Sequence, residues 1–284
     1  ATRSDDGSGA VSGLTLDGGT IAVTGAGSGI GAGIARAAAA RGMRVVVSDV
    51  AADRAEAVAA ELRDGGADAV AVVADVGEAA AVERLADVAC ERGDLRVAVN
   101  NAGVEATGRV WEVPPEATER LIRVNLLGAF NGVRAFVGRM VAAGEPAAVV
   151  NVASMAALIS GPVSQAAYNA SKHGVQALTE SLALELAEAG APIAVHVVNP
   201  GPVATRIFTD APTAGERGAG ARDDYHAMVT EQGISGDEAG AIVVAGVERG
   251  GFWIETHPEM RAAASAQRAR MLTGALPPAP PDLG

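Results

Sequence analysis

Cysteine, aromatic residues and long hydrophobic runs are scarce in this sequence of 284 residues. The single cysteine, Cys90, excludes an internal disulfide and favours a reducing, cytoplasmic setting. No run of about 18 apolar residues occurs, and the first residues lack the apolar core of a signal peptide, so we expect no membrane partner. Aromatic residues make up only 3% of the chain, which leaves alanine, valine, leucine and isoleucine to build the core.

Positive charge is also in short supply. The formal net charge is -12 at pH 7. Such a surface repels phosphate backbones and anionic lipids, so a nucleic-acid partner is not expected. The four histidines are scattered without the spacing of paired ligands, and no metal site is expected. Any phosphate-bearing ligand must therefore be held by local geometry.

Short apolar segments alternate with helical ones along most of the chain. The pattern predicts strands at 20–24, 44–48, 69–74, 97–100, 149–152, 193–198 and 252–255. It predicts helices at 30–41, 52–64, 79–91, 115–143 and 168–189. Strands made almost wholly of valine, alanine and isoleucine indicate a parallel sheet covered on both faces. The predicted fold is a single, Rossmann-like, doubly wound α/β domain with about seven strands.

Composition sets the expected domain boundaries. Residues 1–16 are rich in Gly, Ser and Asp and predict a flexible tail, and residues 274–284 predict a proline-rich tail. The catalytic domain then covers 17–273. Within it, residues 205–235 are long, polar and glycine-rich, which is typical of a substrate-binding loop or lid.

A glycine-rich turn, T-G-A-G-S-G-I-G, follows the first predicted strand and contains Gly25, Gly29 and Gly31. Glycine permits positive φ angles and the close approach of a pyrophosphate, while the helix N-terminus that follows attracts an anion. Tight strand-to-helix turns also use glycine for structural reasons alone. Asp49 lies 18 residues beyond Gly31, just past the second strand, where a carboxylate accepts hydrogen bonds from an adenosine ribose. Asp49 has an alternative interpretation as a helix N-cap, but the two features together favour a dinucleotide.

The chain holds 21 arginines and one lysine, Lys172, which lies four residues after Tyr168, one of only two tyrosines. Residues four apart on a helix share a face, so phenol and ammonium can enter one site. Hydride transfer to a carbonyl leaves an alkoxide that needs a proton, and a phenol can supply it. We expect the nearby ammonium and an oxidised nicotinamide to lower the pKa of Tyr168. A surface pair without a role is the alternative.

These residues belong to a larger set that resembles the short-chain dehydrogenase/reductase family. The set comprises the glycine turn, Asp75-Val76, N-N-A-G at Asn100 to Gly103, Asn125, Ser154, Y-N-A-S-K at Tyr168 to Lys172, and Pro200-Gly201. The similarity runs over about residues 16–205, and the last strand is similar too. The order and spacing of the motifs are jointly specific.

The resemblance implies a role for each matching residue. Ser154 would hydrogen-bond the substrate oxygen, Tyr168 would exchange its proton, Lys172 would bind the nicotinamide ribose, and Asn125 would hold a water. The implied catalytic residues are Asn125, Ser154, Tyr168 and Lys172. The implied cofactor-binding residues are Gly25, Ser28, Gly29, Ile30, Gly31, Asp49, Asp75, Val76, Asn101, Ala102, Gly103, Tyr168, Lys172, Pro200, Gly201, Val203 and Thr205.

Asp49 favours NAD over NADP because its carboxylate would repel a 2′-phosphate, and Ser28 stands where phosphate-binding relatives often have a basic residue. The sequence departs from the family at two places. Thirteen residues separate Ser154 from Tyr168, about one more than is commonest, and a bulge near Gly161 is expected to absorb the extra residue. Glu105 follows N-N-A-G-V near the expected pocket, and we interpret it as a solvated loop residue.

The leading hypothesis is an NAD-dependent oxidoreductase that interconverts a secondary alcohol and a ketone. The alternatives are an isomerase or dehydratase of the same fold and a non-catalytic dinucleotide-binding protein. A hydrophobic small-molecule substrate is expected from the predicted pocket residues, which are Met155, Ala156, Leu158, Ile159, Val163, Ile207 and Phe208. The resemblance also implies a homotetramer, or a homodimer, formed through helices 115–143 and 168–189.

Overall fold

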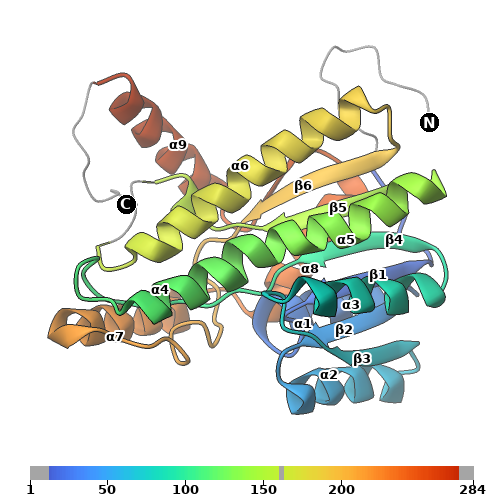
Figure 1. Ribbon diagram of the computed structural model, residues 1–284, viewed down its shortest axis with the longest axis horizontal. Helices are drawn as coiled ribbons and strands as arrows, with labels where there is room; N and C mark the ends of the chain where they lie inside the picture. The colour runs from blue at the N-terminus through green and yellow to red at the C-terminus, as the bar shows by residue number, and fades with distance from the viewer. Residues whose placement is uncertain (1–12, 160–162, 275–284) are drawn as a thin grey trace.

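A computed structural model describes residues 13–159 and 163–274. Its centre is a seven-stranded parallel sheet in the order β3-β2-β1-β4-β5-β6-β7 (Figure 1). The strands are β1 (Thr20–Thr24), β2 (Arg44–Asp49), β3 (Ala69–Val73), β4 (Leu95–Asn100), β5 (Ala147–Val152), β6 (Ile193–Asn199) and β7 (Trp253–Glu255). All seven predicted strands are present, and the Rossmann-like α/β fold is confirmed.

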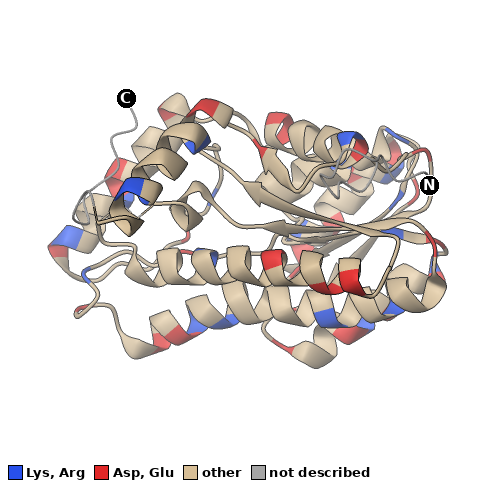
Figure 2. Ribbon diagram, turned by 90° about the horizontal axis from the view of Figure 1, so that it is seen from above, with Lys and Arg blue, Asp and Glu red and all other residues tan. Residues whose placement is uncertain are grey.

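Helices cover both faces of the sheet. One layer contains α1 (Gly29–Ala39), α2 (Ala52–Asp64) and α8 (Gly236–Arg249), and the other contains α3 (Ala79–Glu91), α5 (Gly128–Ala143) and α6 (Ala166–Glu188). Figure 2 shows most charged residues on the helices and connections. The charged residues of the strands are Arg44, Asp49, Arg96 and Glu255, which lie at or next to a strand end. The double burial explains why the strand sequences show no polar alternation.

Alternate residues of each central strand enter the two halves of the core. In β2, Val45 and Val47 pack with the α1 and α2 layer, whereas Val46 packs with the α3 and α5 layer. This alternation is the two-residue period of a strand applied to a sheet that is buried on both sides. None of the helices in the described part of the chain is long and apolar enough to cross a membrane.

Helix α8 lies unusually close to α1. A Cβ added at Gly33 would overlap the carbonyl group of Gly236, and one added at Gly240 would overlap the backbone of Gly33. The two backbones can approach this closely only because these positions carry no side chain. The contact ties a late segment of the chain to the helix that begins at the glycine turn.

The predicted helix over 115–143 is interrupted. It consists of α4 (Pro115–Ile122), a π-helical turn η1 (Arg123–Leu127) and α5. A π turn contains one extra residue per turn and often marks a functional site. Here it carries Asn125, which is 2% exposed.

The segment 205–235, predicted as a substrate-binding loop or lid, is not a loop throughout, because residues Gly215–Gln232 form helix α7. Its polar, glycine-containing sequence has only three buried residues and little amphipathic pattern, so the helical period was not visible. Helix α9 (Pro258–Leu272) follows β7. Both α7 and α9 lie on the side of the sheet to which the carboxyl ends of the strands point (Figure 1). A 3₁₀ turn, η2 (Met155–Ala157), follows β5.

The predicted N-terminal tail is wrong at its inner end. Leu14 and Leu16 are 6% and 3% exposed and belong to the α1 and α8 half of the core. The Leu14 amide also donates to the carbonyl of Val247 at 3.3 Å. The remainder of the predicted tails, 1–12 and 275–284, lies outside the described residues.

Candidate active site

A cavity of about 580 Å³ opens at the carboxyl ends of the strands. Such an edge is where ligands meet doubly wound sheets, and the volume is typical of a small-molecule site. The predicted site residues that line it are Gly25, Ser28, Gly29, Ile30, Asp49, Asp75, Val76, Asn101, Ala102, Gly103, Ser154, Tyr168, Lys172, Pro200, Gly201, Val203 and Thr205. Gly31 and Asn125 lie directly behind its wall, as their contacts below show.

The glycine turn after β1 uses Gly25, Gly29 and Gly31 for two different reasons. Gly25 and Gly29 have φ angles of 63° and 55°, which favour glycine. A side chain on Gly25 would also come within 2.8 Å of the Ala102 Cα. Gly31 has no positive φ, and a Cβ there would overlap the Gly25 carbonyl group. The turn is therefore compact, and no side chain at Gly25 or Gly29 separates its backbone from the cavity.

The start of α1 is suited to an anion. Ser28 occupies the N-cap, but its side chain makes no capping hydrogen bond, and the first turn contains no acidic residue. The backbone N–H groups and the positive end of the helix dipole are thus left for a ligand. A pyrophosphate is the kind of anion that such a helix start can hold, and Gly25, Ser28 and Gly29 line the cavity at this point.

Asp49 at the end of β2 is held firmly. Its side chain accepts hydrogen bonds from the amides of Gly27 at 3.1 Å and Ala51 at 2.9 Å, and it pairs with Arg54 at 3.1 Å. Arg54 also lines the cavity, and the sequence analysis missed it. Its position one turn into the helix after Asp49 was the available signal, since residues in the first turn of α2 point back towards β2.

The adenine end of the cavity is formed after β3. Asp75 accepts from the Gly77 amide at 2.8 Å and lies 3.3 Å from a nitrogen of Arg123, which comes from the π turn. Val76 beside it is 6% exposed. The carboxylate thus fixes the turn that carries the apolar Val76 side chain into the cavity wall.

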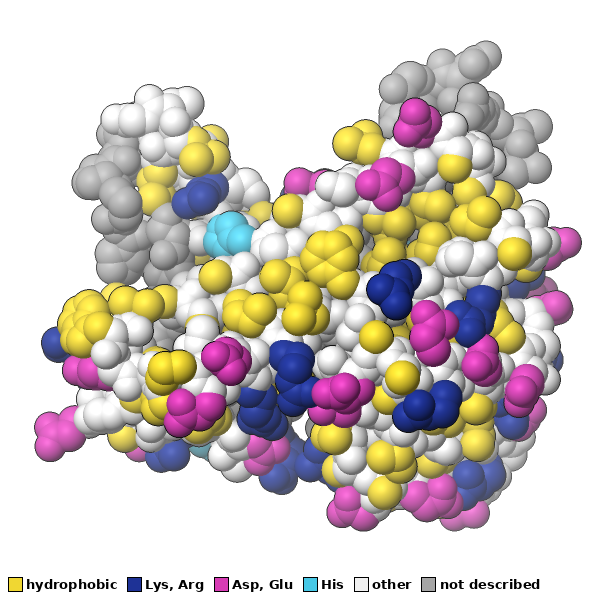
Figure 3. Space-filling view, viewed as in Figure 1, with side chains coloured by type: hydrophobic (Ala, Val, Ile, Leu, Met, Phe, Trp, Pro, Cys, Tyr) yellow, Lys and Arg dark blue, Asp and Glu magenta, His cyan; other side chains and the backbone are white. Residues whose placement is uncertain are grey.

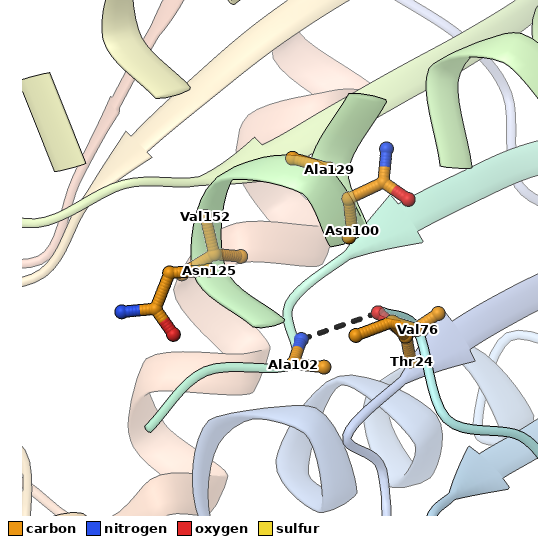
Figure 4. A pocket seen from close by; sticks show the side chains of 8 residues that line it. Thr24, Val76, Asn100, Ala102, Asn125, Ala129 and Val152 are labelled. Carbon is orange, nitrogen blue, oxygen red and sulfur yellow. Dashed lines mark hydrogen bonds between the residues drawn. The ribbon is translucent and has the colours of Figure 1, made fainter. Parts of the chain in front are cut away.

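The Asn100 to Gly103 segment links β4 to the glycine turn. The Asn101 side chain donates to the carbonyls of Thr24 at 2.8 Å and Gly25 at 3.2 Å, and the Ala102 amide donates to the Thr24 hydroxyl at 3.2 Å. Figure 4 shows this last bond at a small pocket of about 10 Å³, large enough for one water. Asn101 therefore acts as a brace on the turn that faces the cofactor site.

The side-chain amides of Asn100 and Asn125, which line that small pocket, belong to separate hydrogen-bond networks. Asn100 donates to Asn151 at 2.8 Å, and Asn151 donates to Thr179 at 3.0 Å, which joins β4, β5 and α6. The Asn125 amide exchanges hydrogen bonds with the backbone of Val104 at 2.8 and 2.9 Å. Figure 4 shows the Asn100 and Asn125 amides pointing in opposite directions. Asn125 thus fixes the loop after the N-N-A-G motif.

Tyr168 and Lys172 lie on one face of α6, as the spacing predicted. The Lys172 nitrogen is 5.6 Å from the centre of the Tyr168 ring and donates to the carbonyl of Val152 at 2.9 Å. A Cβ on Gly103 would lie 3.5 Å from both the Lys172 nitrogen and the Asn125 oxygen, which places these three residues together. Burial lowers the pKa of Lys172 from 10.5 to about 8, so its ammonium form still predominates near neutrality.

Ser154 completes the group from the end of β5. Its oxygen accepts from the Ala156 amide at 3.1 Å, capping the 3₁₀ turn that follows. Its side chain also forms a hydrogen bond with Tyr168 that lowers the pKa of the phenol. The extra residue expected near Gly161 falls outside the described residues, but the same connection contains Ser164, whose φ of 75° is rare for a non-glycine residue.

The sequence analysis expected Lys172 and an oxidised nicotinamide to lower the pKa of Tyr168. Without the nicotinamide, the groups of the protein raise this pKa instead. Desolvation raises this pKa well above its ordinary value of 10, and the charge of Glu105 raises it further. The ammonium at 5.6 Å from the ring centre does not offset these effects. The phenol is therefore neutral at physiological pH.

The interpretation of Glu105 as a solvated loop residue is wrong. The side chain is 2% exposed and forms part of the cavity wall. One carboxyl oxygen accepts from the Ala106 amide at 2.9 Å, and the other has no partner within 13–159 and 163–274. Burial raises the pKa of Glu105 from 4.5 to about 8. A one-residue departure from a motif gave no sequence signal of burial, because carboxylates are seldom buried without a partner.

The outer part of the cavity is mainly apolar. Of the predicted pocket residues, Met155, Ala156, Ile159, Ile207 and Phe208 line it, whereas Leu158 and Val163 are not part of its wall. Tyr225, Met228 and Val229 of α7 and Met260 of α9 complete the wall. The Tyr225 ring stacks on Phe208 with centroids 5.5 Å apart, and its hydroxyl donates to the carbonyl of Val163 at 3.0 Å. The sequence analysis placed the 205–235 segment at the substrate site without naming Tyr225, Met228 or Val229 individually, and it missed Met260 because it did not predict α9.

Comparison with known proteins gives a consistent result. The family model for short chain dehydrogenases matches residues 19–215. A 1-deoxy-11-beta-hydroxypentalenate dehydrogenase from Streptomyces exfoliatus is 39% identical over 201 residues, which cover 70% of this chain and 71% of that protein. A 3-alpha-(or 20-beta)-hydroxysteroid dehydrogenase from Mycobacterium tuberculosis is 38% identical over 183 residues, covering 64% of this chain and 68% of that protein.

A solved structure agrees over almost the whole chain. It is a short chain dehydrogenase/reductase from Burkholderia phymatum in complex with NAD, with a TM-score of 0.88 and 32% sequence identity. The superposition covers 94% of this chain and 99% of the other. The matching family model, the similar relatives and the shared fold establish that this chain belongs to the short-chain dehydrogenase/reductase family of oxidoreductases.

Proposed function

We propose that the protein is an NAD(H)-dependent oxidoreductase that interconverts a secondary alcohol and a ketone on a hydrophobic small molecule. The observation that carries the proposal is that Ser154, Tyr168 and Lys172 converge in the cavity that also contains the glycine turn. A hydroxyl, a phenol and an ammonium at one place can bind and protonate a carbonyl oxygen.

Ser154, Tyr168 and Lys172 have different roles in the proposed reaction. Ser154 and Tyr168 both hydrogen-bond the substrate oxygen, and Tyr168 gives its proton to that oxygen in reduction or receives one in oxidation. The raised pKa of Tyr168 keeps the phenol protonated, which is the form that reduction needs. Lys172 adds positive charge to the site and holds the ribose next to the nicotinamide. When bound, the nicotinamide supplies or accepts the hydride.

The oxidation direction needs the phenolate, which positive charge must stabilise. Lys172 provides one positive charge, and an oxidised nicotinamide would add a second. Asn125 acts indirectly: its bonds to Val104 fix the loop that faces Lys172. The family's water-holding role for Asn125 stays part of the proposal.

NAD is the proposed cofactor in preference to NADP. The Asp49 carboxylate is 6% exposed and is fixed by two backbone amides, so it cannot easily swing away from a 2′-phosphate. Arg54 is the one cation that pairs with it, and that pairing neutralises part of the repulsion. The NAD complex of the Burkholderia phymatum relative supports the same choice.

An apolar alcohol is the proposed substrate. The outer wall contains Met155, Ile159, Phe208 and Met228, which suit a hydrophobic molecule. Two relatives are named as dehydrogenases of a hydroxypentalenate and of hydroxysteroids. These names support a cyclic secondary alcohol as the first class to test.

The decisive experiment is a screen of secondary alcohols with NAD and of ketones with NADH, followed by absorbance of the reduced nicotinamide. Tyr168→Phe should lower kcat by about a hundredfold to ten-thousandfold, because it removes the proton donor and leaves the ring in place. Its affinity for NADH, measured by fluorescence, should stay near that of the wild type. Turnover by Tyr168→Phe at the wild-type rate would refute the proposed role.

We further propose that the protein works in the cytoplasm as a homotetramer, with a homodimer as the smaller alternative. The outer surface of α5 and α6 and the turn before α5 expose large apolar side chains, as Figure 3 shows by the gathering of hydrophobic side chains over these helices. They include Leu127, Phe130 and Val141, which are 48%, 48% and 46% exposed, and Leu184, which is 74% exposed. Exposed apolar surface of this kind is typical of a subunit interface.

A further inference from the structure

Glu105 is a buried acid for which the proposed chemistry has no use. It follows the N-N-A-G-V segment after β4, is 2% exposed and forms part of the wall of the catalytic cavity. Its charge influences Tyr168 and Lys172 from α6 and Tyr225 from α7, so the carboxyl group faces the same space as these side chains.

The carboxyl group of Glu105 is only half satisfied. One oxygen accepts a hydrogen bond from the neighbouring Ala106 amide at 2.9 Å, and the other, Oε2, has no partner in the described residues. A buried polar atom without a partner costs about 1–3 kcal/mol. Glu105 lines the cavity, and because the final torsion of a glutamate side chain is broad, rotation about it can turn a carboxyl oxygen towards a ligand there.

The surrounding charges limit what that ligand group can be. Lys172 lines the same cavity as Glu105, and its positive charge repels a cationic substrate. An oxidised nicotinamide would repel such a substrate as well. The carboxylate form of Glu105 disfavours an anionic substrate. A neutral hydroxyl fits both forms of the acid, because it donates to the carboxylate and accepts from the protonated carboxyl group.

We propose that Glu105 is a specificity-determining residue that hydrogen-bonds a second hydroxyl on the substrate, next to the one that is oxidised. The preferred substrates are then diols and hydroxyketones with an otherwise apolar body. This inference rests on the proposed alcohol–ketone chemistry and deepens it. Met155, Ile159 and Phe208 contact the apolar part of the substrate, while Glu105 forms a hydrogen bond with its additional hydroxyl.

The test compares cyclohexanol with the vicinal cyclohexanediols. The measured quantity is the ratio of kcat/KM for diol to kcat/KM for cyclohexanol, since changes common to both substrates cancel in it. We expect the wild type to favour at least one diol isomer by about tenfold to a hundredfold, the effect of one hydrogen bond to a carboxyl group.

Two variants at the same position separate the hydrogen bond from packing. Glu105→Gln keeps a donor and an acceptor and should retain most of the ratio, whereas Glu105→Leu should bring it close to one. Glu119→Leu on the exposed side of α4 is the matched control and should leave the ratio unchanged. NADH titration by fluorescence verifies that each variant still folds and binds the nucleotide.

The outcomes distinguish the two proposals. A wild type that oxidises cyclohexanol and the diols equally well, or a Glu105→Leu variant with an unchanged ratio, overturns the role of Glu105 and leaves the alcohol–ketone function standing. A wild type that oxidises none of the alcohols in the broader screen and reduces no ketone overturns the proposed function and this inference with it.

Discussion

Replacing Glu105 with glutamine removes one titratable group from the cavity wall while nearly keeping its shape, and it should change how stability depends on pH. In the unfolded chain this carboxyl group ionises near its ordinary pKa of 4.5, whereas burial in the folded protein raises the pKa to about 8. Between these two values the folded state binds more protons than the unfolded state. The contribution of Glu105 to stability is therefore full below the unfolded pKa and is lost as the pH rises towards the folded pKa.

The size of the effect follows from the two pKa values. Each unit of pH in the window is worth about 1.4 kcal/mol. Relative to Glu105→Gln, the free energy of unfolding of the wild type should thus fall by less than about 1 kcal/mol by pH 5 and by about 3 kcal/mol by pH 7. It should continue to fall until about pH 8 and change little at higher pH. Tyr168, Lys172 and Tyr225 are present in both proteins, and the charge of Glu105 acts on the pKa of each of them, so the difference measures the titration of Glu105 together with this coupling.

Urea unfolding of both proteins at several pH values measures this difference directly. The free energy of unfolding of Glu105→Gln minus that of the wild type should rise between about pH 5 and pH 8 and then level off. A difference that stays constant with pH would refute the reasoning, because it would mean that Glu105 titrates alike in the folded and unfolded states.

Three further predictions concern other parts of the molecule. Asp49→Ala should relax the preference for NAD by lowering KM for NADP, since Arg54 would then face a 2′-phosphate without its carboxylate; native preference for NADP in the same kinetic assay would contradict the cofactor assignment. Gly132→Ala should destabilise the protein by about 1–3 kcal/mol in denaturant unfolding, because its Cβ would overlap the Asn100 amide and break the bond to Asn151; an unchanged midpoint would show that the amide can move freely. Light scattering should give the mass of a tetramer, and a monomeric mass would rule out the proposed interface.

The repeating part of the fold was predictable because one physical signal sets it. Strands such as β1 and β2 are buried on both faces, so their sequences are continuous apolar segments, and the helices between them begin and end near the predicted residues. The motif residues of the site were predictable for a related reason. They follow these strands directly, and the carboxyl ends of parallel strands meet at one edge of the sheet.

The remaining features depend on tertiary contacts that leave little trace in the local sequence. The π turn at Asn125 is one extra residue within an otherwise helical pattern. Helix α7 carries few apolar residues because it covers the mouth of a cavity and not the core. The burial of Leu14 depends on a hydrogen bond to Val247, more than two hundred residues away in the sequence. Glu105 was misjudged because Tyr168 and Tyr225, which line the same cavity, come from helices α6 and α7 that lie far along the chain.

The close glycine contact between α1 and α8 has a consequence for how this protein can be altered. The segment that forms most of the outer cavity wall leaves the sheet after β6 and returns at Gly236, which lies against Gly29 at the start of α1. Thr205, near the beginning of that segment, also lies against Gly29, so both ends of the segment contact the start of α1. Residues 205–232 form an exchangeable cassette, and grafting a different cassette between these two anchor points should redirect substrate choice while the nucleotide half keeps its shape.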